Sequence, residues 1–269
     1  MKQRKVIYDF GANDGQNIPY YLMKGDLVVA VEANPVLCER LVSRYGAEIK
    51  AGRLVVENKV LDAAGGKEKV PFFVHKHNHV LSQFPKPEHN FEDFVSMDLP
   101  ASSPGDLIEK YGYPHYVKID IENYDVEILR AVFGAGIFPE YISAECLSAE
   151  VVAVIIASGQ YQSYKMVESA LVSKTYKNCN IVTVSGQQKF SFLHHSAGPY
   201  GDDILGKWFT EEGILRVLGV FGFGWKDIHA ARTPTAKPVV ISLKATLIDY
   251  LCFRMKIKLA LAKTYFGLG

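Results

Sequence analysis

A short apolar run that ends in a glycine-punctuated turn is the first stretch whose residues could do chemistry. Residues 6–10 are β-branched or aromatic apart from Asp9, and Gly11 and Gly15 follow in the turn. Such a run predicts a buried strand with Asp9 near its carboxyl end, where open α/β sheets bind ligands. The glycines let the backbone approach a bound molecule, and Asn13 tolerates left-handed dihedral angles. We therefore interpret the turn as a binding site.

The spacing of the turn and a second acid indicate the kind of ligand. The glycines are spaced G-x-x-x-G instead of the G-x-G-x-x-G of dinucleotide folds, which favours a nucleoside over a pyrophosphate. The next predicted strand, 27–31, ends in Glu32. An acid about 20 residues past the turn can accept hydrogen bonds from both ribose hydroxyls. For the glycines alone, a doubly wound sheet in which they only pack is an equally good interpretation.

Three strings resemble the class I methyltransferases that use S-adenosylmethionine, and more narrowly the FkbM-type O-methyltransferases. They are 9–15 (DFGANDG), 31–35 (VEANP) and 117–125 (VKIDIENYD). The last string, with its lysine, aliphatic and acidic residues before a helix, is the most specific. The family usually has glycine where this chain has Asn123, and asparagine is the next most tolerant residue of left-handed backbone. The resemblance covers residues 6–148.

The resemblance implies S-adenosylmethionine as cofactor and a hydroxyl of a sugar, glycan or small natural product as acceptor. It also implies that Asp62 lies against the adenine and accepts its exocyclic amine, although an aspartate before Gly65 and Gly66 is nearly as well explained by a turn. The residues expected to bind the cofactor are Asp9, Gly11, Asn13, Gly15, Glu32 and Asp62.

Asp120 and Glu122 are the acids expected at the transferred methyl. They follow the predicted strand 115–120, and an extended backbone would direct both into the crevice at the carboxyl edge of the sheet. Such a pair can hold the acceptor hydroxyl, orient the amino-acid end of the cofactor or share a divalent cation. Without a third ligand we favour the first two roles and predict no metal. The alternative is that Glu122 and Asp125 only favour the N-terminus of the following helix.

The segment 75–104 has no helical or strand period, so we predict a long functional loop, often a lid in other proteins. His75, His77 and His79 alternate and could share a face of a strand as metal ligands. We favour acceptor recognition or base catalysis instead, and assign it to His79.

The pattern of elements predicts an α/β fold. It is a doubly wound, mostly parallel sheet of seven strands, the Rossmann-like class I methyltransferase fold, with a C-terminal helical extension. Residues 189–193 are expected to supply the seventh strand, and Pro71 marks 69–74 as an edge or bulged strand. Glu145 ends the strand 141–146 and either joins the acidic rim or pairs with Lys118. We predict a catalytic domain at 1–195 and an extension at 196–269, which packs on the same domain in one alternative.

Composition excludes several classes of function. Lysine and arginine total 30 against 29 acids, so no overall field attracts nucleic acid. Residues 1–5 are polar and lack the apolar region of a secretory signal, from which we expect a cytoplasmic protein. The four cysteines form no C-x-x-C pair, which argues against a zinc site or a disulfide framework.

The tail 243–266 is predicted to be a basic amphipathic helix. Five cations face one acid among leucines and phenylalanines, so the helix could contact an anionic membrane surface. It is too interrupted by charge to span a membrane. Docking on the domain or on a second copy in a homodimer is the favoured alternative.

The sequence thus predicts an S-adenosylmethionine-dependent methyltransferase that acts on a hydroxyl. Two hypotheses from other classes stay open: an NAD-dependent oxidoreductase on a similar sheet, and a non-catalytic nucleoside-binding or scaffold protein.

Overall fold

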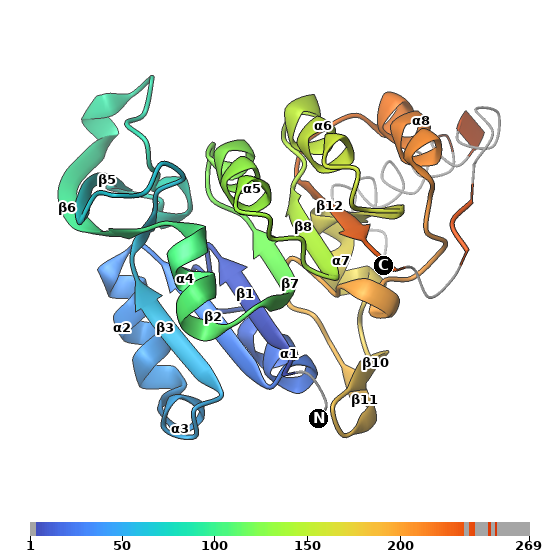
Figure 1. Cartoon of the computed structure of the whole chain (residues 1–269), viewed down its shortest axis with the longest axis horizontal. Helices are drawn as coiled ribbons and strands as arrows, with labels where there is room; N and C mark the ends of the chain where they lie inside the picture. Colours follow the sequence, from blue (N-terminus) through green and yellow to red (C-terminus); the bar gives the residue numbers. More distant parts are fainter. Residues whose placement is uncertain (1–3, 234–236, 240–246, 249–250, 252–269) are drawn as a thin grey trace, which may run out of the picture.

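A seven-stranded sheet forms the centre of the computed structural model, which describes residues 4–233, 237–239, 247–248 and 251 (Figure 1). The strands lie in the order β3-β2-β1-β7-β8-β12-β9, and only β12 runs antiparallel to its neighbours. This confirms the α/β, doubly wound, mostly parallel sheet. Their bounds are β1 Val6–Phe10, β2 Leu27–Glu32, β3 Leu54–Asn58, β7 Pro114–Ile119, β8 Tyr141–Glu145, β9 Ser163–Glu168 and β12 Lys226–Ala231.

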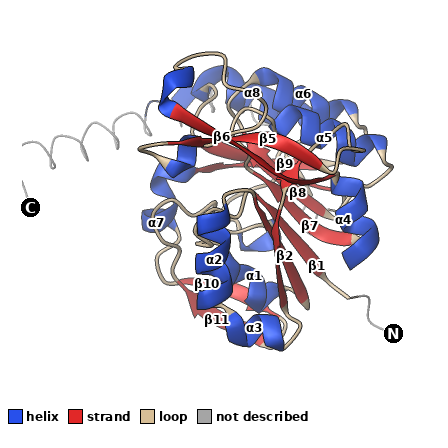
Figure 2. Ribbon diagram, turned by 90° about the vertical axis from the view of Figure 1, so that its left-hand side faces the viewer, coloured by secondary structure: helices blue, strands red, loops and turns tan. Residues whose placement is uncertain are grey.

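Helices cover both faces of this sheet, as the continuous apolar runs of β1 and β2 require (Figure 2). One face packs against α4, α5, α6 and α8, and the other against α1, α2, α3 and α7. The helices are α1 Ile18–Lys24, α2 Pro35–Arg44, α3 Gly46–Lys50, α4 Pro104–Tyr111, α5 Asp125–Gly134, α6 Ala149–Ala157, α7 Val172–Thr175 and α8 Glu211–Phe221.

Local sequence signals set two of the helix starts. The Asn34 side chain accepts a hydrogen bond from the Val36 N–H at the start of α2, with Pro35 in the first helical position. Ser103 and Asp106 form a reciprocal capping box at the start of α4. These bonds fix where the chain leaves β2 and where it enters the helix before β7.

The seventh strand is β12, so the prediction of a strand at 189–193 in the sheet is wrong. Gly186–Phe190 is β11, which pairs with β10 (Cys179–Thr183) in a hairpin outside the sheet. The sequence of β12, KDIHAA, gives no clear strand signal because Asp227 and His229 are polar and nonetheless buried. Residues beyond 195 therefore complete the central sheet.

A small second sheet replaces much of the loop expected at 75–104. It has the order β4-β6-β5, from Val60–Leu61, Phe94–Ser102 and Lys69–His75. Two short 3-10 turns, η1 (His79–Leu81) and η2 (Phe91–Asp93), connect β5 to β6. Pro71 lies in the outer strand β5, as predicted. The strand β6 escaped sequence analysis because four consecutive residues, 95–98, are exposed and show no alternation.

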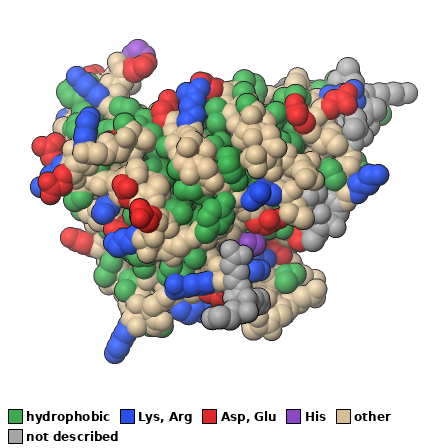
Figure 3. Space-filling model, in the orientation of Figure 1, with side chains coloured by type: hydrophobic (Ala, Val, Ile, Leu, Met, Phe, Trp, Pro, Cys, Tyr) green, Lys and Arg blue, Asp and Glu red, His purple; other side chains and the backbone are tan. Residues whose placement is uncertain are grey.

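The helix α8 lies in the predicted C-terminal extension, and its Ile214 and Val217 pack into the core of the sheet. The tail helix predicted at 243–266 lies almost entirely outside the described residues. Just before it, Val239 exchanges backbone hydrogen bonds with Trp208 and Thr210, at 2.9 and 3.1 Å. No helix among the described residues is long and apolar enough to cross a membrane. On the face shown in Figure 3, acidic and basic side chains are interspersed.

Two neighbouring residues of α8 test whether this helix belongs to the catalytic fold. Ile214 is fully buried, whereas Leu215 is 48% exposed. We expect Ile214→Ala to lower the free energy of unfolding by about 2–5 kcal/mol because it leaves a core cavity. The control, Leu215→Ala, should change it by at most about 0.5 kcal/mol. Thermal and denaturant unfolding measure both, and equal small effects would show that α8 is not part of the cooperative core.

Candidate active site

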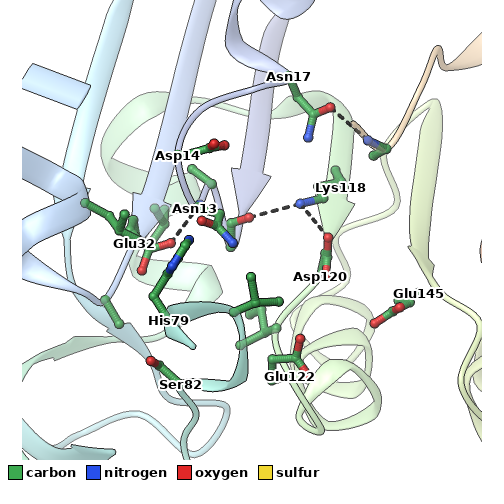
Figure 4. Close-up of a pocket in the computed structure, with 18 of the residues that line it drawn as sticks. Asn13, Asp14, Asn17, Glu32, His79, Ser82, Lys118, Asp120, Glu122 and Glu145 are labelled. Carbon is green, nitrogen blue, oxygen red and sulfur yellow. Dashed lines mark hydrogen bonds and ion pairs between the residues drawn. The ribbon is translucent and has the colours of Figure 1, made fainter. Parts of the chain in front are cut away.

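A cavity of about 330 Å³ opens at the carboxyl ends of β1, β2, β7 and β8 (Figure 4). This volume falls in the range of roughly 300–1,000 Å³ that is usual for small-molecule sites. Six of the predicted site residues line it, namely Gly11, Asn13, Glu32, His79, Asp120 and Glu122. The other three, Asp9, Gly15 and Asp62, are not among its lining residues.

The turn after β1 has the left-handed backbone conformations that its glycines and asparagine predict. The glycines are needed for packing within the protein, and not for the approach of a ligand as the sequence suggested. Gly11, Gly15 and Asn13 have φ of +83°, +79° and +48°. A Cβ on Gly11 would lie 1.9 Å from the Asp120 carbonyl oxygen, and one on Gly15 would lie 2.4 Å from the Leu41 side chain. Glycine is therefore required at both positions because the turn packs closely against other parts of the same chain. This packing holds the Gly11 backbone in place where it lines the cavity.

Glu32 joins the end of β2 to this turn. Its two carboxylate oxygens accept backbone N–H bonds from Asn13 and Asn34, at 2.7 and 2.8 Å. Burial raises the pKa of Glu32, while the two N–H groups favour its charged form. Each carboxylate oxygen has a second lone pair, so the group can still accept two hydrogen bonds from a ligand. This is the geometry expected for binding a vicinal diol.

Lys118 is buried where β1 and β7 end. Its Nζ lies 3.0 Å from the Gly11 carbonyl oxygen, 3.0 Å from Asp120 Oδ2 and 3.4 Å from Asp9 Oδ1. Burial acts to lower the pKa of Lys118, but the carboxylates of Asp120 and Asp9 outweigh it, so the ammonium stays charged. Asp9 is completely buried, and burial raises its pKa to about 6 against the effect of Lys118. Asp9 thus faces the lysine, and its predicted contact with the cofactor stays a prediction.

Acidic side chains dominate the end of the cavity near β7, β8 and β12. Asp120, Glu122, Glu145 and Asp227 all line it. Burial and the charge of Asp120 raise the pKa of Glu122 to about 7. Burial, Asp120 and Glu122 raise the pKa of Glu145 to about 7 as well. Glu145 thus belongs to the acidic rim, while the ion pairs of Lys118 are with Asp9 and Asp120.

The chain turns sharply after Asp120, so the extended backbone expected through Glu122 is absent. Asn123 has φ of +62°, which confirms that asparagine adopts the left-handed conformation at this position. Asp125 Oδ1 accepts the Ile121 N–H at 3.1 Å, a structural role at the start of α5 that the sequence also suggested. The turn, instead of a strand, brings Asp120 and Glu122 to the same cavity.

The histidines after β5 and Asp62 differ in how they lie relative to the cavity. His79 reaches the cavity from η1 and is exposed. His75 Nδ1 accepts backbone N–H bonds from His77 and Asn78, and the described residues contain no group of side chains suited to a metal ion. Asp62 Oδ1 accepts the Ala64 N–H at 3.1 Å, which fits the turn-forming alternative. A contact of Asp62 with adenine stays a prediction.

Several lining residues come from parts of the chain that sequence analysis did not assign to the site. Asn17 Oδ1 accepts hydrogen bonds from Ser196 Oγ and the Ala197 N–H, at 2.8 and 3.0 Å, and so ties the loop after β11 to the turn after β1. This loop brings His195 to the cavity, beside Trp225. Lys118 gave one sequence signal for this site, because a lysine within an apolar strand such as β7 is buried and needs polar or charged partners. The other positions depend on long-range packing.

Comparison with known proteins gives a family match for one segment of the chain. Residues 9–141 match the model of the methyltransferase FkbM domain. Among solved structures, the FkbM methyltransferase of Methylobacillus flagellatus is 17% identical, with a TM-score of 0.42, over 61% of this chain and 40% of that one. An S-adenosylmethionine-dependent O-methyltransferase of Thermotoga maritima is 9% identical, with a TM-score of 0.38, over 88% of this chain and 62% of that one. The chain thus spans less than two thirds of both. No curated protein matches it.

The matched segment contains many of the residues that line the cavity. It includes the turn after β1, Glu32 and the stretch from Lys118 to Glu122. Residues 9–141 are therefore identified as an FkbM-type methyltransferase domain.

Proposed function

We propose that the enzyme transfers a methyl group from S-adenosylmethionine to a hydroxyl of a sugar, a glycan or a small natural product. The observation that carries the proposal is Glu32, a carboxylate held by two backbone N–H groups at one end of a cavity whose other end is acidic. The first end suits a ribose diol, and the second suits a positive charge beside an acceptor hydroxyl.

The chain offers partners for each part of the cofactor. Glu32 would bind the ribose hydroxyls, and the buried Asn13 Oδ1, which has no hydrogen-bond partner among the described residues, can accept from a bound donor. Leu37, Val60 and Leu61 supply an apolar wall suited to the adenine ring. When bound, S-adenosylmethionine supplies an electrophilic methyl group on a positively charged sulfur. The acids at the far end of the cavity stabilise that charge.

The acceptor end provides positioning and proton uptake. Asp120 is held by Lys118 at 3.0 Å, so its carboxylate has a fixed direction into the cavity. Glu122 has a pKa of about 7, which allows a carboxylate to take up a proton near neutral pH. The sugar or natural product follows from the resemblance to the family.

The test compares ligands of the alternative functions. Calorimetry should show binding of S-adenosylhomocysteine and no response to NAD. Labelled S-adenosylmethionine, incubated with a panel of sugars and natural-product alcohols, then reports methyl transfer. Binding of NAD in place of S-adenosylhomocysteine would support the oxidoreductase hypothesis. Cofactor binding with no transfer to any hydroxyl in the panel would favour the non-catalytic hypothesis.

The first prediction concerns Glu32. Glu32→Ala removes the acceptors for a ribose diol and is expected to weaken S-adenosylhomocysteine binding by about 1–3 kcal/mol. Calorimetry measures this change, and a thermal melt of the same sample confirms that the variant is folded despite the freed Asn13 and Asn34 N–H groups. Glu39→Ala, at an exposed position of α2, is the control. Unchanged affinity in Glu32→Ala would remove the ribose assignment.

The second prediction concerns Asp120. Asp120→Asn keeps the shape of the side chain but removes its charge. We expect methyl transfer to fall by about 10²-fold while cofactor affinity changes far less, if the carboxylate acts on the acceptor. The exposed Asp98→Asn on β6 should leave both quantities unchanged. Equal losses in kcat/KM and in cofactor affinity would instead make Asp120 a cofactor ligand.

The third prediction concerns pH. Because the pKa of Glu145 is raised to about 7, the folded protein holds a proton that the unfolded chain releases nearer its ordinary pKa of 4.5. The stability due to this proton is present at low pH and is lost as the pH rises through 7. Glu145→Gln should therefore be more stable than wild type at pH 8, on the order of 1 kcal/mol after solvent screening, and not at pH 4. A stability difference that does not vary with pH in thermal melts would contradict the raised pKa.

A further inference from the structure

Two histidines line the cavity, and they lie at different ends of it. His79 comes from η1, and Figure 4 shows it on the same side as Glu32, away from Glu145. His195 comes from the loop after β11, which the sequence did not connect with the site. Its ring centroid lies 5.4 Å from that of Trp225, the residue directly before β12.

The strand order places His195 at the acceptor end. In the sheet, β2 lies on one side of β1, and β7, β8 and β12 lie on the other. The Gly224 N–H donates to the carbonyl of Cys146, which follows β8, so Trp225 lies where β8 and β12 meet. His195 therefore shares its end of the cavity with Glu145 and Asp227, whereas Glu32 marks the opposite end.

His195 is held in place from its backbone and from its ring. Its φ of +66° is uncommon for a residue with a side chain, and such outliers persist only where surrounding contacts enforce them. Here the next two residues, Ser196 and Ala197, donate to Asn17 Oδ1. The ring is exposed, and its centroid lies 4.1 Å from that of His194 and 5.4 Å from that of Trp225. The site thus has a fixed imidazole at its acceptor end.

We infer that His195, and not His79, takes the proton of the acceptor hydroxyl, with Asn17 as its positioning residue. This inference rests on the proposed function. The O–H proton passes to the lone pair of an imidazole nitrogen and gives an imidazolium, while the oxygen keeps the O–H electron pair. The oxygen bonds the methyl carbon, and sulfur retains the pair of the carbon–sulfur bond that breaks. Glu145 and Asp227 line the same end of the cavity.

The first test needs no acceptor. S-adenosylmethionine and S-adenosylhomocysteine differ by one methyl group and one positive charge at the sulfur. In protein carrying ¹³C-labelled histidine, His195→Gln and His79→Gln assign the ring signals. We expect the His195 signals to differ between the two complexes and the His79 signals to coincide. Identical His195 signals in both complexes would overturn the inference. Failure of both ligands to bind would instead refute the proposed function.

The second test uses any alcohol that is methylated in the acceptor panel. His195→Gln should lower kcat by about 10²–10⁴-fold, the usual contribution of a general base, with S-adenosylhomocysteine affinity retained. His89→Gln, at an exposed position that does not line the cavity, is the matched control and should stay within about twofold of wild type. Wild-type kcat in His195→Gln, or the larger loss in His79→Gln, would overturn the inference and leave Glu122 or His79 as the base.

The role of Asn17 has its own comparison. Asn17→Ala removes the acceptor of the Ser196 and Ala197 bonds, and we expect kcat to fall while the affinity for S-adenosylhomocysteine is largely kept. Asn17→Asp retains an oxygen at this position and should rescue kcat. If Asn17→Asp and Asn17→Ala lose kcat equally while both remain folded in thermal melts, Asn17 does not act by holding this loop.

Discussion

The buried ammonium of Lys118 is the interaction on which the site depends. It links Asp9 in β1, the carbonyl of Gly11 in the following turn, and Asp120 at the end of β7. Without this cation, two carboxylates would face each other across the join of the two strands, one of them fully buried. Removing one partner of a buried ion pair usually costs about 3–5 kcal/mol because it leaves an uncompensated charge. Lys118 therefore holds both the fold at the centre of the sheet and the direction of Asp120.

The turn after β1 transmits this arrangement to the rest of the cavity. Its Asn13 N–H binds Glu32 at the end of β2, and its Asn17 side chain holds residues 196 and 197 near the end of β8. The same turn packs against the Asp120 carbonyl so closely that Gly11 has no room for a Cβ. Three segments that are distant in sequence are thus positioned by one short loop. A side chain at Gly11 would disturb both ends of the cavity because it displaces the backbone of this loop, whereas a side-chain change at Asn17 acts on the loop that carries His195.

Much of the fold could be predicted because its central strands are apolar runs with clear helix starts, such as Asn34 before Pro35 and Ser103 before Pro104. The strand β12 could not, because Asp227 and His229 are buried by tertiary packing that no local pattern encodes. The same difference applies to the site. Glu32 was predictable from its place at a strand end, whereas His195 reaches the cavity only because Asn17, nearly 180 residues earlier, binds the next two residues. Residue spacing along the sequence predicts where strands end. It does not predict which distant loop packs against those strand ends.

The acidic end of the cavity connects ligand charge with protonation. Glu122 and Glu145 have raised pKa values because burial and neighbouring carboxylates disfavour a further negative charge, and the charge of Lys118 is already shared by Asp9 and Asp120. A positive charge brought into this end by a ligand favours the ionised forms of both glutamates. By linkage, ionisation of the glutamates then favours binding of that charge. In the proposed transfer from S-adenosylmethionine, the loss of positive charge from sulfur reverses this effect and restores the tendency of the glutamates to hold a proton. The electrostatics of the acidic rim thus favour a positively charged ligand before that transfer and a proton on the protein after it.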